Sequence, residues 1–169
     1  MKFFETSKYY TLKKSTYISL RWIAAIGQLI SINFVYFILD LKFNFLLSNL
    51  IVLVGVISNL YLIFIYQKSQ LTDRSALIFL IIDIFVLGTL IYLTGGIVNP
   101  FVIFLIIPSV FASSNLGLRT NLSLVTLTII VLVLLTFYSK SLPDPLNLHF
   151  HVHNYYYYSI PISLIIALV

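Results

Sequence analysis

Six long apolar runs leave few folds open to this chain. They cover residues 18–39, 46–66, 75–93, 101–116, 122–138 and 155–169. An apolar helix of about 20 residues crosses the hydrocarbon layer of a membrane. A backbone in lipid must satisfy its own hydrogen bonds, so runs of this kind span as helices. We therefore predict an all-α polytopic membrane protein with six transmembrane helices. The sixth run is still apolar at Val169, so we expect that helix to be truncated there.

Composition excludes most soluble classes of protein. Hydrophobic residues make up 60% of the 169 positions and charged residues only 9%, whereas an ordinary soluble domain is about one-quarter charged. The chain has no cysteine, which excludes disulfides, thiolate metal sites and a thiol nucleophile. The motifs of phosphate-binding loops, serine hydrolases and zinc proteases are also absent.

The positions of the basic residues predict the orientation of the helices. One side of the membrane receives only Lys42 and Lys140. The other side receives eight basic residues: Lys2, Lys8, Lys13, Lys14, Arg21, Lys68, Arg74 and Arg119. The positive-inside rule then places the amino terminus in the cytoplasm. Residues 1–17 are predicted to be a cytoplasmic segment and residues 18–169 the membrane domain. The net charge of +5 thus reports topology, and we expect no nucleic-acid partner.

A polar stretch, residues 92–101, breaks the apolar pattern between the third and fourth runs. Gly95 and Gly96 are expected to end the third helix, because glycine adopts left-handed backbone conformations at little cost. Asn99 is a natural N-cap, and Pro100 fits the first turn of the next helix. A well-made turn between two helices would explain all four residues.

The same stretch also offers the chemistry of a binding site. Tyr92, Thr94 and Phe101 add hydroxyls and aromatic faces at the predicted outer edge of the membrane. A quinone has carbonyl acceptors on a planar ring, so Asn99 or glycine N–H groups can hold its head while Phe101 or Tyr92 stacks on it. The residues alone leave both interpretations open.

Asp83 lies halfway along the third run, where an ionised carboxylate is costly. We expect it to face the bundle interior, either relaying a proton or bonding a polar side chain of another span: Gln28, Asn33 or Asn59. Leu87, Leu90 and Thr94 share its helical face, which is either a groove for a lipid tail or a packing stripe. Pro108 should kink the fourth helix.

Other residues have simpler interpretations. Arg21 and Trp22, at the start of the first run, are expected at the cytoplasmic interface, with Arg21 snorkelling to water. His149, His151 and His153 alternate before the sixth run, a pattern that a weak metal site can use. Because no acidic cluster accompanies them, we predict no metal site.

Several segments resemble one known family. The segment 95–101, GGIVNPF, resembles the G-G-x-x-N-P-F heptapeptide of the RegB/PrrB/ActS redox-sensing histidine kinases. The segment 20–28, LRWIAAIGQ, is similar to the L-R-W-x-A-x-x-G-Q stretch of that family's first span, and Asp83 with residues 92–94 resembles its third. The resemblance covers essentially the whole chain but only the sensor half of the family's proteins.

The resemblance implies a function and a set of site residues. In that family the heptapeptide is associated with ubiquinone sensing, and the membrane domain controls a cytoplasmic kinase that phosphorylates a response regulator. The implied quinone site is Gly95, Gly96, Asn99, Pro100 and Phe101, with Tyr92 and Thr94 beside it. A bacterial inner-membrane location, contact with lipid and the quinone pool, and a homodimer in the full-length protein are also implied.

The chain departs from the family pattern in two respects. It lacks the phospho-accepting histidine region and the ATP-binding domain, and the family's redox-active cysteine has no counterpart. We therefore expect a piece of a longer reading frame that catalyses nothing by itself. Two other functions remain open: a small transporter or permease component with Asp83 as its coupling carboxylate, and a structural membrane subunit.

Overall fold

The computed structural model describes residues 12–138 and 154–168. Helices dominate these residues, and their bounds are α1 (Lys14–Phe37), α2 (Phe45–Phe64), α3 (Asp73–Leu93), α4 (Ile107–Asn115), α5 (Leu118–Phe137) and α6 (Asn154–Leu168). Two 3₁₀ segments, η1 (Gly96–Val98) and η2 (Pro100–Ile106), connect α3 to α4. Two-residue strands β1 (Leu12–Lys13) and β2 (Gln70–Leu71) pair antiparallel. The prediction of an all-α fold is confirmed, and this small strand pair is its one exception in the described part of the chain.

Four of the described helices are long and apolar enough to cross a membrane: Lys14–Phe37, Phe45–Phe64, Asp73–Leu93 and Leu118–Phe137. Two further apolar helices, Pro100–Asn115 and Tyr156–Leu168, are shorter. Together they match the six predicted runs in order and place, with most bounds shifted by only a few residues.

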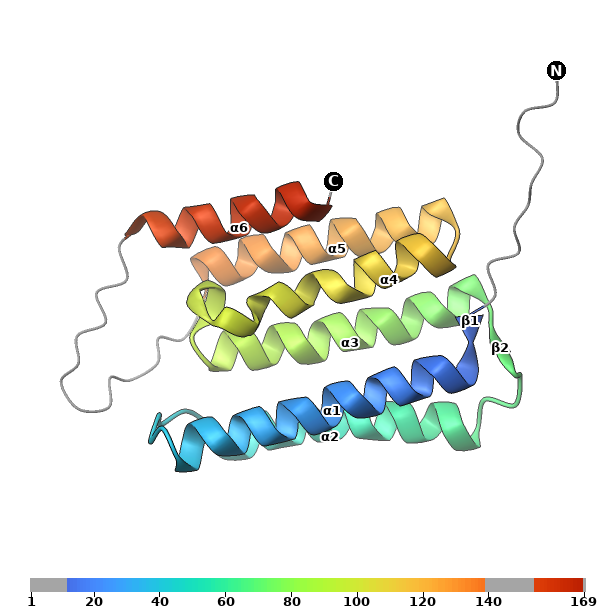
Figure 1. Cartoon of the computed structure of the whole chain (residues 1–169), viewed down its shortest axis with the longest axis horizontal. Helices are drawn as coiled ribbons and strands as arrows, with labels where there is room; N and C mark the ends of the chain where they lie inside the picture. Colours follow the sequence, from blue (N-terminus) through green and yellow to red (C-terminus); the bar gives the residue numbers. More distant parts are fainter. Residues whose placement is uncertain (1–11, 139–153, 169) are drawn as a thin grey trace, which may run out of the picture.

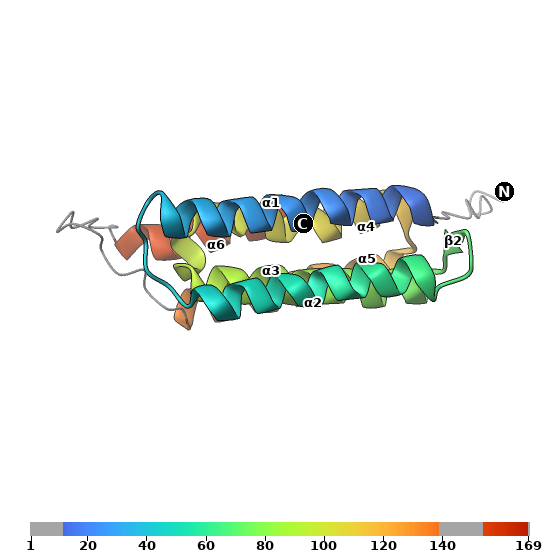
Figure 2. The same cartoon turned by 90° about the horizontal axis from the view of Figure 1, so that it is seen from below.

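The helices form two layers (Figures 1 and 2). Helices α2, α3 and α5 lie in one layer, and α1, α4 and α6 lie in the other. Helix α3 is central: half of its most apolar window is buried, against 17% for α1. The peripheral α1 therefore presents most of its surface to lipid, while α3 touches α2, α5 and the segment η2.

The apolar core follows the two sides of α3. Fully buried side chains of α3, η2 and α5 make the larger cluster: Ile84, Ile91, Leu105, Leu124 and Leu132. A smaller cluster joins α1, α2 and α3: Ile32, Val52, Val86 and Leu90. Leu90 is thus a packing residue, and Leu87 packs against the larger cluster. The predicted stripe on α3 is a packing stripe, so the tail-groove alternative was wrong.

The predicted cytoplasmic end of the bundle is tied by polar contacts. The Lys14 ammonium donates to the carbonyl oxygens of Ile63 and Tyr66 at the end of α2. Cations stabilise this end of a helix, where carbonyls lack partners. The Asp73 carboxylate accepts the Gly117 N–H at 3.0 Å, which joins the start of α3 to the start of α5.

The fourth span has the predicted bounds but a different conformation. Its first half, Pro100–Ile106, is a 3₁₀ helix, and α geometry begins only at Ile107. Pro108 lies in the first turn of α4, where a missing N–H costs little. Pro108 therefore does not interrupt the interior of an α-helix as predicted, and the helix type changes just before it. The Ile107 N–H bonds Phe104 O, three residues back.

Candidate functional site

Residues 92–101 form the turn between α3 and the fourth span, which we call the α3–α4 hairpin, and its glycines have the predicted role. Helix α3 ends at Leu93, and Gly95 and Gly96 follow with φ values of 116° and 63°. Side chains make this left-handed region costly, so glycine is the residue that closes the turn without strain. Both glycines are buried, and Ile97 beneath them is completely buried. The backbone of the hairpin is therefore held tightly against the bundle.

The Asn99 side chain stabilises the hairpin by hydrogen bonds within it. Its Oδ1 accepts the Phe101 N–H at 2.9 Å, which makes it the predicted N-cap of η2. Its Nδ2 donates to the Thr94 carbonyl at 2.9 Å and to the Thr94 hydroxyl at 2.8 Å. The Thr94 hydroxyl in turn donates to Leu90 O at 2.7 Å. Both N–H bonds of the Asn99 amide are thus engaged within the turn, and the side chain positions the hairpin instead of offering free donors.

The aromatic residues of the stretch form its outer surface. Tyr92 and Phe101 are 36% and 38% exposed, and Pro100, which precedes Phe101, is exposed as well. The Phe101 ring lies 5.8 Å from that of Phe104, centroid to centroid. Flat rings exposed at a membrane edge suit the face of a planar lipid headgroup. Of the predicted site residues, Tyr92, Pro100 and Phe101 are therefore the accessible ones, and the two rings are those that can stack on a headgroup.

A substitution at Gly95 tests how strictly the turn requires glycine. Gly95→Ala is expected to cost about 1–3 kcal/mol, because alanine at a φ of 116° is strained. Gly27→Ala is the matched control, since a Cβ there meets nothing within 4 Å. It should be neutral or slightly stabilising, because Gly27 lies inside α1. Unfolding of both variants in lipid nanodiscs measures the difference, and equal stabilities would contradict the requirement.

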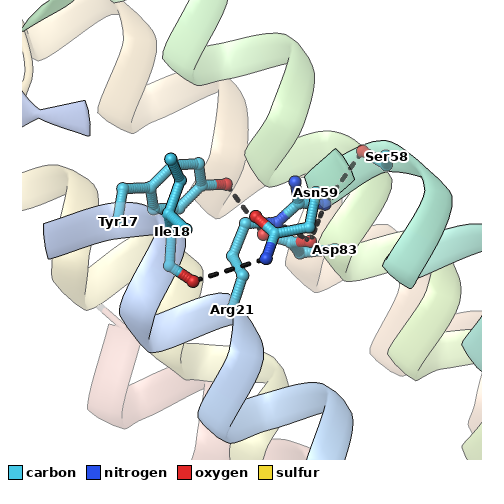
Figure 3. A network of polar contacts seen from close by, with 6 residues as sticks. All are labelled: Tyr17, Ile18, Arg21, Ser58, Asn59 and Asp83. Carbon is cyan, nitrogen blue, oxygen red and sulfur yellow. Dashed lines mark hydrogen bonds and ion pairs between the residues drawn. The ribbon is translucent and has the colours of Figure 1, made fainter. Parts of the chain in front are cut away.

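A buried polar cluster lies near the middle of α3, between α1, α2 and α3 (Figure 3). Arg21 donates to Asp83 Oδ1 from both Nε, at 3.0 Å, and Nη2, at 2.8 Å. The Tyr17 hydroxyl donates to Asp83 Oδ2 at 2.8 Å. Arg21 Nη2 also donates to Ser58 Oγ at 2.9 Å. We call these four residues, with Asn59, the polar cluster.

The polar cluster corrects the expectation for Arg21. The side chain does not snorkel to the interface: Arg21 is only 6% exposed, and its guanidinium lies 5.5 Å from the ring centres of Tyr17 and Phe79. Helix α1 begins at Lys14, earlier than predicted, so Arg21 lies about two turns inside it. A cation at that depth needs a buried anion, and Asp83 supplies it.

The expected partners of Asp83 were also wrong. Its interior position is confirmed, but the side chain bonds Arg21 and Tyr17. Asn33 bonds the Leu29 carbonyl of its own helix, and Asn59 bonds the Ile18 carbonyl. Tyr17 was not predicted from the sequence to be a partner of Asp83. Its spacing of four residues from Arg21 puts both on one face of α1, and that spacing is the signal that the sequence offered.

Tyr17 extends the polar cluster to a fourth helix. Its ring stacks on Phe111 of α4, with centroids 5.9 Å apart and planes inclined by 20°. Helix α1 packs chiefly against α2 and makes few direct contacts with α3, so these side chains connect α1 directly to the central helix. The polar cluster therefore couples the peripheral helix to α3 and to α4, the two helices that the hairpin joins.

Two hollows lie elsewhere in the described part of the chain. One, of about 330 Å³, is lined by Thr136, Phe137, Tyr157 and Tyr158 at the same end of the bundle as the hairpin. The other is an apolar groove of about 230 Å³ between α1 and α2, with Leu29 and Asn49 among its lining residues. Some residues named in the sequence analysis lie outside the described residues: the three alternating histidines, His149, His151 and His153, and the basic residues Lys2, Lys8 and Lys140.

Comparison with known proteins identifies the family. Residues 23–168 match the model of the PilS-like transmembrane domain. Over 110 residues the chain is 36% identical to the sensor histidine kinase RegB of Cereibacter sphaeroides, a match that covers 64% of this chain and 24% of that protein. No solved structure matches the chain. The chain therefore belongs to the family of PilS-like transmembrane domains, and it is a multi-span sensor domain like that of RegB, located in the bacterial inner membrane.

Proposed function

We propose that this domain senses the redox state of the membrane quinone pool and that ubiquinone is bound at the α3–α4 hairpin. The single observation that carries the proposal is the GGIVNPF turn, whose buried glycines lie beside two exposed aromatic rings. Tyr92 and Phe101 are the exposed rings, 36% and 38% accessible. They would hold the face of the headgroup by stacking.

The residues of the hairpin would have different roles in binding. Gly95 and Gly96 fix the turn, Asn99 with Thr94 closes it, and Pro100 starts the next helix. Because the Asn99 amide already donates to Thr94, a headgroup carbonyl would draw its donor from the Tyr92 hydroxyl or from a rearranged Asn99. A rearrangement of that kind would loosen the hairpin, and a ligand that favours one arrangement shifts the balance between two conformations.

The arrangement of helices offers a path for the signal. Helix α6 packs against both 3₁₀ segments of the hairpin, η1 and η2, and its direction carries the chain back toward the predicted cytoplasmic side (Figure 1). A change in the hairpin would therefore move α6. In the full-length protein we propose that α6 leads toward a dimeric cytoplasmic kinase, which phosphorylates a response regulator.

Photolabelling with an azido-ubiquinone tests the proposal on the chain in lipid nanodiscs. Labelling is expected on residues of the hairpin and to fall severalfold in Phe101→Ala, which removes an exposed ring without touching the turn's hydrogen bonds. Phe85→Ala is the matched control, because Phe85 is an exposed ring of α3, 54% accessible, outside the hairpin. Equal labelling of Phe101→Ala and the unmodified chain, or labelling confined to the hollow at Tyr157, would refute binding at the hairpin.

A further inference from the structure

Two buried polar atoms of the polar cluster have no hydrogen-bond partner among the described residues: Arg21 Nη1 and Asn59 Oδ1. Arg21 is 6% exposed and Asn59 only 2%. Leaving a polar atom buried and unpaired is costly, and more so when it carries charge. Such atoms are rare in native proteins, and a bound water or ion is one of the physical explanations for them.

Both atoms belong to the same part of the bundle. Asn59 donates through Nδ2 to Ile18 O at 3.4 Å, while its neighbour Ser58 accepts from Arg21 Nη2 at 2.9 Å. Ile18 and Arg21 lie one turn apart on α1, so one turn of α2 faces one turn of α1. In Figure 3 the side chains of Arg21 and Asn59 lie close together, beside Asp83.

The two atoms require opposite partners. Arg21 Nη1 is a charged donor and needs an acceptor, whereas Asn59 Oδ1 is an acceptor and needs a donor. A carbonyl can satisfy only the first and an ammonium only the second. One O–H oxygen satisfies both, because a hydroxyl accepts and donates at once. The simplest occupant is therefore a single hydroxyl-bearing group between α1 and α2.

We propose that Arg21 and Asn59 bind one O–H group inside the membrane domain, either a water molecule or a hydroxyl of a reduced quinone headgroup. The second source rests on the proposed quinone-sensing function. An oxidised quinone has no proton for Asn59 Oδ1, so the site discriminates against it.

Asp83 is the more exposed partner of the buried pair: its side chain is 26% exposed, while that of Arg21 is 5% exposed. An occupant would therefore enter past the carboxylate, which the Tyr17 hydroxyl and Arg21 hold in place. This second site is distinct from the hairpin: Asp83 and Thr94 are separated by about 16 Å along a helix with a 1.5 Å rise per residue.

The test uses the whole chain in nanodiscs with ¹⁵N-labelled arginine side chains. Magnetisation transfer from water to the Arg21 guanidinium is measured by solid-state NMR. We expect transfer in the unmodified chain and its loss in Asn59→Leu, which removes the acceptor. Asn49→Leu is the matched control, since the Asn49 side chain of the same helix bonds only Phe45 O of its own helix, and it should retain the transfer.

A second arm distinguishes water from quinol. Reduced and oxidised ubiquinone with a short tail are added separately, and the fluorescence of Trp22, the one tryptophan of the chain, reports a ring bound beside Arg21. Loss of the water transfer with reduced quinone alone, together with a Trp22 response, supports the quinol source. Transfer that persists with both forms supports water.

The proposal is overturned if Arg21 shows no water transfer in the unmodified chain and neither quinone form changes its spectrum. It is also overturned if Asn59→Leu and Asn49→Leu behave alike. If the hairpin is not photolabelled but water transfer to Arg21 is observed, the proposed function is refuted and the proposal for Arg21 and Asn59 is still supported. The two proposals are therefore separable.

Discussion

Asp83→Leu is expected to lower the stability of the bundle by about 3–5 kcal/mol, the cost of breaking a buried ion pair from one side. The substitution leaves the Arg21 guanidinium buried in an apolar layer without its counter-ion. It also removes the acceptor of the Tyr17 hydroxyl at 2.8 Å. Because the polar cluster joins α1 directly to α3, whereas α1 packs chiefly against α2, we expect the contact between α1 and α3 to loosen first.

A double-mutant cycle measures this coupling. Arg21→Leu should be about as harmful as Asp83→Leu, whereas the double variant should recover part of the loss, because it buries no unpaired charge. Lys42→Leu is the matched control: its ion pair with Asp40 is exposed, and exposed pairs contribute about 1 kcal/mol or less. Reversible unfolding in mixed detergent, followed by circular dichroism, gives the stabilities of the cycle and of the control. An Asp83→Leu variant as stable as Lys42→Leu would show that the buried pair does not stabilise the bundle.

The second large effect is expected at the hairpin. Asn99→Ala should cost about 2–4 kcal/mol, because it removes a helix cap and leaves the Thr94 carbonyl without its partner. Three hydrogen bonds disappear together: those to Phe101 N, Thr94 O and Thr94 Oγ1. We expect the hairpin to loosen while the bundle keeps its helical content.

Amide hydrogen exchange across residues 92–101 checks this expectation. Exchange should accelerate in Asn99→Ala and stay unchanged elsewhere in α3 and α5. Asn115→Ala is the matched control, because the Asn115 amide makes one bond within its own helix, to Phe111 O at 2.9 Å. Unchanged protection of Phe101 and its neighbours in Asn99→Ala would mean that the glycines alone fix the turn.

The helices could be predicted from the sequence to within a few residues. Length and apolarity decide whether a segment spans, and both are local properties of the chain. The hairpin was predictable for the same reason. Gly95 and Gly96 adopt the positive φ angles that few other residues tolerate, and Asn99 caps the helix that Pro100 begins. Each of these effects acts over two or three residues.

The conformation of the fourth span was less predictable. An apolar run of 16 residues is compatible with either an α or a 3₁₀ start. The segment Pro100–Ile106 is 3₁₀ where it packs against α3 and α6. The contact with α6 joins segments far apart in the sequence, so no local pattern reveals it. Leu87 and Leu90 were likewise predicted to share one stripe on α3, whereas Leu87 packs against the larger core cluster and Leu90 belongs to the smaller one.

By itself the sequence determined the membrane-spanning helices and the conformation of the α3–α4 turn, because both depend on neighbouring residues. It also placed Asp83 in the interior, since a carboxylate in the middle of an apolar run has no other low-energy place. Only the tertiary structure decided which cation meets that carboxylate. Arg21 and Asp83 are 62 residues apart, and their pairing depends on how α1, α2 and α3 pack, which is a property of the whole bundle.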